Sequence, residues 1–108
     1  MNASIDDELH NKFSDELPTI RYKESHIDRF ESNGMTSDGI HWNAYLTRKE
    51  RCMHFQLLID GSLMAKTDIY PCREDVTNLY TEALYLTAGL IWSAIRAKRI
   101  ERYNNDKQ

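Results

Sequence analysis

The sequence predicts a two-layer α+β domain, in which a three- to four-stranded antiparallel meander packs on one long C-terminal helix. Apolar and polar residues alternate between 24 and 70, whereas apolar residues recur every three or four positions between 71 and 103. A separate apolar stripe precedes Pro18. The 108 residues suffice for one domain with its own core. We therefore interpret 1–108 as a single domain.

The composition is that of a globular protein rather than a disordered one, because 41% of the residues are hydrophobic and 29% are charged. A net charge of −3 argues against non-specific binding to nucleic acid. Acidic residues predominate in 1–40 and basic residues in 41–108. The chain starts with polar and acidic residues, unlike a signal peptide. We expect a cytoplasmic protein in which Cys52 and Cys72 are reduced thiols. The alternative is a disulfide between them, because both belong at the same end of the predicted sheet.

Residues 1–18 predict a short amphipathic helix. Its apolar residues recur every four positions, at Ile5, Leu9, Phe13 and Leu17, and its opposite face is acidic. The proline at 18 ends the helix. Three interpretations stay open: the stripe packs on the domain, the acidic helix engages another protein, or the segment is disordered in solution.

Residues 19–39 carry the weakest pattern. We expect an edge strand at 24–31, where a single helical turn is the alternative. The Asn33-Gly34 pair fits the end of a helix or a turn, and residues 37–39 fit a second turn.

Three clearer strands are expected at 40–47, 51–59 and 63–70, joined by turns at 48–50 and 60–61. Alternate residues of these strands form an apolar face that should pack on the helix. That face comprises Trp42, Leu46, Met53, Phe55, Leu57, Leu63 and Ile69.

The length of the turn at 60–61 can be predicted from which side chains must face the core. A two-residue loop at the Asp-Gly pair would set Leu57 opposite Met64 and turn Lys66 toward the core. A shift of one residue sets Leu57 opposite Leu63, so that both strands present one apolar face. We therefore predict a three-residue loop that ends at Gly61 in the left-handed conformation, with a bulge.

The long helix is expected at 71–103, followed by a tail at 104–108. Pro71 suits the first helical position, and Asn104 and Asn105 are plausible terminators. A helix of this length spans roughly 50 Å, whereas strands commonly span about 17–20 Å, so the helix should outrun the sheet. Its apolar centre is shorter than the ~20 residues that a membrane span needs.

One stripe of this helix predicts a homodimer. The apolar centre is wider than one sheet can cover, and small residues there would let a second helix approach closely. The expected dimerisation residues are Leu86, Gly89, Leu90, Ser93 and Ala97. The alternative is that the helix at 1–18 folds back over the same stripe.

No pattern of catalytic or metal-binding residues stands out. Cys52 and His54 share a strand face with His41 nearby, but the paired spacing of a zinc site is missing. We expect His54 opposite Lys66, with Asp68 on the diagonal, and no evident nucleophile beside them. A phosphate-binding glycine loop is also missing. We therefore predict a non-enzymatic protein with no cofactor and no metal.

The polar face of the predicted sheet suggests the function. Tyrosine and methionine are favoured at interfaces, so we expect a protein-binding module that regulates, adapts or inhibits another protein. Its size is typical of small accessory proteins of bacteria and phages. The expected binding residues are Tyr45, His54, Gln56, Met64 and Tyr70. The opposing view is that residues 1–31 fold over this face. The alternative function is nucleic-acid binding, with Arg96, Arg99 and Arg102 contacting phosphates.

Overall fold

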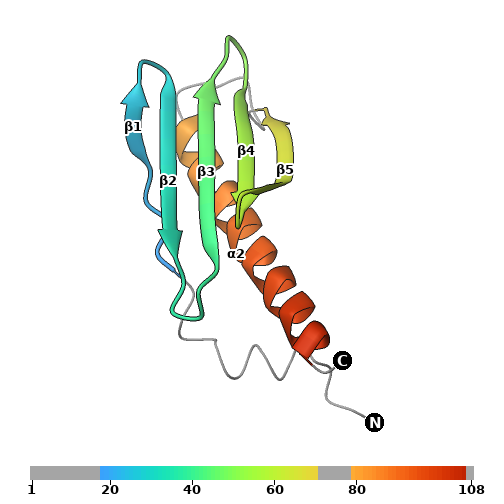
Figure 1. Cartoon of the computed structure of the whole chain (residues 1–108). Coiled ribbons are helices and arrows are strands. Elements are labelled where there is room, and N and C mark those ends of the chain that lie inside the picture. Colours follow the sequence, from blue (N-terminus) through green and yellow to red (C-terminus); the bar gives the residue numbers. More distant parts are fainter. Residues whose placement is uncertain (1–17, 71–78, 107–108) are drawn as a thin grey trace.

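The computed structural model of the protein describes residues 18–70 and 79–106, and these form two layers (Figure 1). The first layer is a five-stranded antiparallel sheet in which the strands follow one another in chain order. The second is a single long helix behind it. The elements are β1 (Lys23–His26), β2 (Arg29–Met35), β3 (His41–Arg48), β4 (Met53–Ile59), β5 (Ser62–Ile69) and α2 (Leu79–Asp106).

This architecture confirms the predicted α+β domain with an antiparallel sheet against a C-terminal helix, although the sheet has more strands than expected. The additional strand comes from residues 23–35, which form the β1–β2 hairpin where a single edge strand at 24–31 was expected. Asp28 makes its tight turn with a positive φ of 64°. The helix predicted at 1–18, and the start of the long helix at 71–78, lie outside the described residues.

Asn33 and Gly34 lie inside β2, which corrects their assignment to a helix end or a turn. Gly34 pairs with Trp42 on the neighbouring strand, and a Cβ atom at position 34 would overlap the indole ring. The glycine is therefore explained by the space that a buried tryptophan needs, which is one reason for glycine within a strand.

The inner face of the sheet forms the core with α2. Alternate residues of β3 and β4 are buried there, including Leu46, Phe55 and Leu57, which are fully enclosed. Ile91 and Ile95 of α2 close the core from the other side. Burial of these large side chains supplies most of the favourable free energy of folding, at about 1.5–3 kcal/mol each.

The β4–β5 turn contains two residues, Asp60 and Gly61, rather than the three expected. Both have positive φ, 49° and 84°, as a two-residue hairpin turn of the type I′ form requires. Gly61 is thus in the predicted left-handed conformation, but Ile59 pairs directly with Ser62.

The expected bulge lies inside β5 instead of in the loop. Leu57 pairs with Ala65 while Leu58 pairs with Leu63, so Met64 is the additional residue. The bulge brings the two strands back to a common inner face, which was the reason for predicting it. Leu63, however, is turned away from the core and is 55% exposed, which corrects its placement among the core residues.

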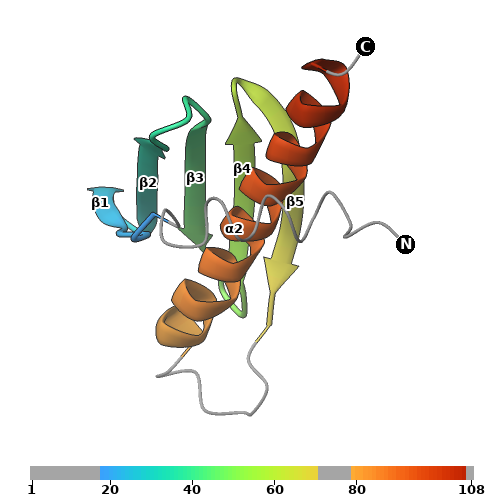
Figure 2. The ribbon, with the colours of Figure 1, turned by 90° about the horizontal axis from the view of Figure 1, so that it is seen from below.

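Helix α2 continues to Asp106, so Asn104 and Asn105 are helical and do not terminate it as predicted. Asparagine is a weaker stop signal than glycine, and its helix propensity is only a few tenths of a kcal/mol below that of most polar residues. The helix runs diagonally from the β2–β3 side toward the β5 side and extends past the sheet (Figures 1 and 2). The domain is accordingly elongated, with extents of 47 × 27 × 21 Å.

Candidate interaction surfaces

The side chains that point away from α2 form the open face of the sheet. Because side chains alternate along a strand, burial of Trp42, Ala44 and Leu46 places the residues between them on this face. The strand register arranges the open face in three rows, Arg29–Thr47–His54–Asp68, Glu31–Tyr45–Gln56–Lys66 and Asn33–Asn43–Leu58–Leu63.

Three of the five residues predicted for protein binding are neighbours on this face. Tyr45 and Gln56 are a direct cross-strand pair, and His54 lies one row away. Met64 is the bulge residue and Tyr70 follows the end of β5, and both are exposed. The structure therefore brings Tyr45, His54 and Gln56 together and sets the other two at the β5 border.

Of the segment 1–31 that could fold over the open face, residues 1–17 lie outside the described part of the chain, and residues 18–31 do not cover this face. The Tyr22 hydroxyl donates a hydrogen bond to Thr87 Oγ1 at 2.9 Å, and the Trp92 indole N–H donates to the Pro18 carbonyl at 2.9 Å. Ile20 packs against the core on the same side. Residues 18–22 thus line α2, and residues 23–31 extend the sheet as β1 and the start of β2.

His54 lies directly opposite Asp68, not opposite Lys66 as expected, because the bulge shifts the register of β5. The His54 Nδ1 atom is 2.6 Å from the Asp68 carboxylate. Lys66 pairs with Gln56 instead. Both members of the His54–Asp68 pair are partly exposed, as expected for a polar contact across the surface of a sheet.

Arg29 covers the ring of Tyr45. Its guanidinium carbon is 5.0 Å from the ring centroid, within the range of a cation–π interaction. The Glu31 carboxylate lies 3.7 Å from Arg29 Nε on the same strand. The aromatic ring at the centre of the open face is therefore held in place by a charged neighbour.

The residues predicted for dimerisation lie along one flank of α2, because their spacing of three or four residues puts them on one side of the helix. Leu86 and Leu90 are 53% and 40% exposed, and Ser93 and Ala97 are exposed as well. Gly89 is partly buried, and a Cβ atom there would meet nothing within 4 Å. We refer to Leu86, Leu90, Ser93 and Ala97 as the α2 flank.

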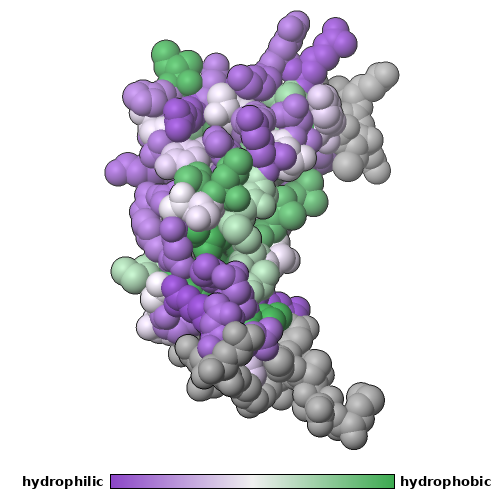
Figure 3. Space-filling view, turned by 45° about the vertical axis from the view of Figure 1, so that its right-hand side comes forward, coloured by the Kyte–Doolittle hydropathy of each residue, from purple (hydrophilic) through white to green (hydrophobic). Residues whose placement is uncertain are grey.

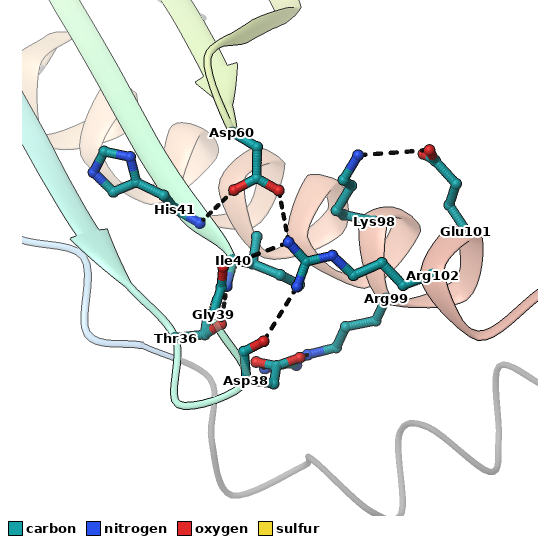
Figure 4. Close-up of polar contacts among 10 residues, drawn as sticks. All are labelled: Thr36, Asp38, Gly39, Ile40, His41, Asp60, Lys98, Arg99, Glu101 and Arg102. Carbon is teal, nitrogen blue, oxygen red and sulfur yellow. Dashed lines mark hydrogen bonds and ion pairs between the residues drawn. The ribbon is translucent and has the colours of Figure 1, made fainter. Parts of the chain in front are cut away.

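The basic end of α2 is joined to the turns of the sheet (Figure 4). Arg99 is buried and donates two hydrogen bonds to the Asp38 carboxylate, at 2.7 and 2.9 Å. Arg102 donates to Asp60 Oδ2 at 2.9 Å and to the Asp38 carbonyl at 3.1 Å. Of the three arginines expected to contact phosphates, two thus bind carboxylates of this chain, and Arg96 is exposed on the helix surface.

These contacts shift the titration of both aspartates. The hydrogen bonds from Arg99 lower the pKa of Asp38 from 3.8 to about 2, against the opposing effect of burial. The pKa of Asp60 is lowered first by the backbone N–H of His41, which donates to Oδ1 at 3.0 Å, and then by the charge of Arg102. A sequence pattern could have predicted this cluster. Both aspartates lie in turns that belong at one end of the sheet, and basic residues recur at the end of the helix.

Among residues 18–70 and 79–106, no three His, Cys, Asp or Glu side chains are grouped as metal ligands. No helix in the same part of the chain is long and apolar enough to cross a membrane. Comparisons with protein-family models, with curated proteins and with solved structures find no match to this chain. What the protein does must therefore be inferred from its own surfaces.

Proposed function

We propose that this protein is a small non-enzymatic protein-binding module, a homodimer that regulates, adapts or inhibits another protein. The partner docks on the open face of the sheet. One observation carries the proposal: within the described residues, 18–22 line α2 and 23–31 extend the sheet, so neither part covers the open face. A polar sheet face with tyrosine at its centre is well suited to recognition of a protein.

The centre of the open face has the make-up of a binding hot spot. Tyr45 offers a flat apolar ring, and Arg29 stacked on it holds the ring in one orientation. Tyrosine and arginine are the residue types that, with tryptophan, contribute most at protein interfaces. Glu31 and Lys66 lie in the same row and provide charged groups at the rim. We expect a partner that places an apolar or aromatic side chain against Tyr45.

Protein binding is preferred over nucleic-acid binding because of the way the arginines are engaged. A phosphate would have to displace Asp38 from Arg99, which is buried, and Asp60 from Arg102. Opening a buried ion pair is costly, because it leaves a charge without a partner. The proposal places the module in the cytoplasm, where the buried free thiol of Cys52 would stay reduced.

The proposal is tested by affinity capture from a cytoplasmic extract, with quantitative mass spectrometry of two matched variants. Tyr45→Ala removes the central ring of the open face, whereas Tyr85→Ala removes an exposed ring on α2. We expect capture of the specific partner to fall by about tenfold or more with Tyr45→Ala, as for a hot-spot residue, and to be unchanged with Tyr85→Ala. Equal capture by both variants would contradict the use of the open face.

A further inference from the structure

We propose that two copies of this chain join at the β5 edge, so that their sheets form one continuous ten-stranded antiparallel sheet. The α2 flank of each copy then lies over the inner face of β5 of the other copy. This inference specifies the contact surface of the homodimer in the proposed function and rests on it.

The two edges of the sheet differ in their fitness for pairing. The β1 edge is four residues long, carries Lys23, Glu24 and His26, and has an irregular register with β2. Short, charged and irregular edges are those that resist pairing with another chain. The β5 edge is eight residues long, with Lys66 and Asp68 as its two charged residues, and it is exposed along almost its whole length. Its own bulge is at Met64, so residues 65–69 keep a regular register. Edge pairing therefore favours β5.

Among the described residues, the inner face of β5 is covered at Ile69 and in part at Ala65, but it is exposed at Thr67. Thr67 pairs with Phe55 and faces the same side, but Phe55 is fully buried and Thr67 is exposed. The difference arises because α2 packs on β4 and β3. Leu86 and Leu90 of α2 are exposed as well. Figure 3 shows apolar residues gathered across the β5 side of the molecule, between more hydrophilic regions.

The charges of β5 select a second copy of the chain as the occupant. In an antiparallel pair centred on Thr67, Lys66 lies opposite Asp68 of the second copy, and Asp68 lies opposite its Lys66. A pair centred on Lys66 would set two ammonium groups against each other, which is unfavourable. The strand is thus complementary to itself in one register, with the two-fold axis at Thr67.

The same two-fold axis sets both helices on one side of the joined sheet, because an antiparallel edge pair has its axis perpendicular to the sheet. The end of α2 that projects lies past the turns that carry Asp38 and Asp60, so it is outside this contact (Figure 1). The part of α2 that would face the second copy is the α2 flank. The α2 flank and the exposed inner side of β5 at Thr67 would then be covered by the same contact, as in other closed two-fold assemblies.

Disulfide trapping tests the register directly in a Cys52→Ser, Cys72→Ser background that keeps its melting temperature. Residues opposite each other in antiparallel strands have Cα atoms about 4.5–5.5 Å apart, within the span of a disulfide. Thr67→Cys should therefore give a covalent dimer under mild oxidation. The control is Ala65→Cys, whose two copies would lie roughly 13 Å apart in this register and should stay unlinked.

Charge exchange provides a second test, by sedimentation equilibrium. Lys66→Asp and Asp68→Lys each place like charges opposite each other twice, so each variant alone should dimerise about tenfold or more weakly than the natural chain. An equimolar mixture of the two variants should associate again, because opposite charges then face each other at both positions. Loss of the His54 contact in Asp68→Lys would not produce this recovery, so the mixture separates an edge contact from local damage.

The outcomes separate the two proposals. A dimer that is trapped by Thr67→Cys and restored by mixing supports the β5 edge. A dimer with no trapping and no response to the charge variants overturns the edge contact and leaves dimerisation through α2 alone. A mass near 12.7 kDa at micromolar concentration, independent of concentration, overturns the homodimer itself. Partner capture through Tyr45 remains a separate measurement in every case.

Discussion

The two faces of the sheet are built from the same strands but meet different demands. On β4, Phe55 and Leu57 are fully buried under α2, whereas His54 and Gln56 between them are partly exposed. The inner face is dictated by the core, since any polar side chain there would lose its water. No such demand explains Tyr45 or the Arg29 that covers it. The residues of the inner face are thus explained by folding, whereas those at the centre of the open face are better explained by binding.

The largest expected effect comes from breaking the inner face alone. Phe55→Ala should lower the free energy of unfolding by about 3–5 kcal/mol, because it leaves a cavity in a packed core. His54→Ala, on the adjacent residue, removes a surface contact with Asp68 and should lower it by less than about 1 kcal/mol. Urea denaturation of both variants measures the contrast, and similar losses would show that the two faces do not differ as described.

A smaller effect is expected from a single added methyl group on the inner face. Gly34→Ala directs a Cβ atom into the ring of Trp42 and should lower the free energy of unfolding by up to about 3 kcal/mol, as overpacking does. Asn33→Ala, one residue earlier on the open side, is the matched control and should change it by no more than about 0.5 kcal/mol. Thermal denaturation would contradict this contrast if the alanine at 34 were as stable as the one at 33.

The third prediction concerns the ion pair between Arg99 of α2 and Asp38 of the β2–β3 turn. The pKa of Asp38 is lowered from 3.8 to about 2 in the folded protein, so its ionised form is the one that stabilises the fold. That stabilisation is complete above the unfolded pKa and is lost as the pH falls through about 2, a total of about 2 kcal/mol. Urea denaturation between pH 5 and pH 2 measures it. Asp38→Asn should flatten the slope in this range, and an unchanged slope would assign the acid sensitivity to other carboxyl groups.

The alternation of side chains along strands and the spacing of apolar residues along a helix predicted the parts of the fold that depend on local sequence. The alternation around Phe55 and Leu57 identified the inner face, and the spacing around Ile91 and Ile95 identified the helix. The role of Gly34 could not be seen, because an Asn-Gly pair signals a turn unless the tryptophan beside it in space is known. The position of the bulge was missed for the same reason, since a strand can absorb an additional residue wherever packing allows it.

The candidate surfaces were predictable to a different extent. Tyr45, His54 and Gln56 share a face because side chains alternate along strands, so the sequence alone could group them. The partners of Arg99 and Arg102 could not be deduced, because Asp38 and Asp60 come together only when two turns meet the end of the helix. Which arginines bind carboxylates of the same chain is thus a tertiary property that residue spacing does not reveal.

The order of the strands bears on how fast this chain reaches its fold. Every strand pairs with its neighbour in sequence, so each pairing closes only a short loop and loses little chain entropy. The contacts that join distant parts of the chain are those of α2 with the residues before it, such as Tyr22 with Thr87, 65 residues apart. Proteins dominated by local contacts fold faster than all-β domains of similar size. We expect this meander to fold rapidly for a protein with so much sheet, with docking of the helix as its most demanding step.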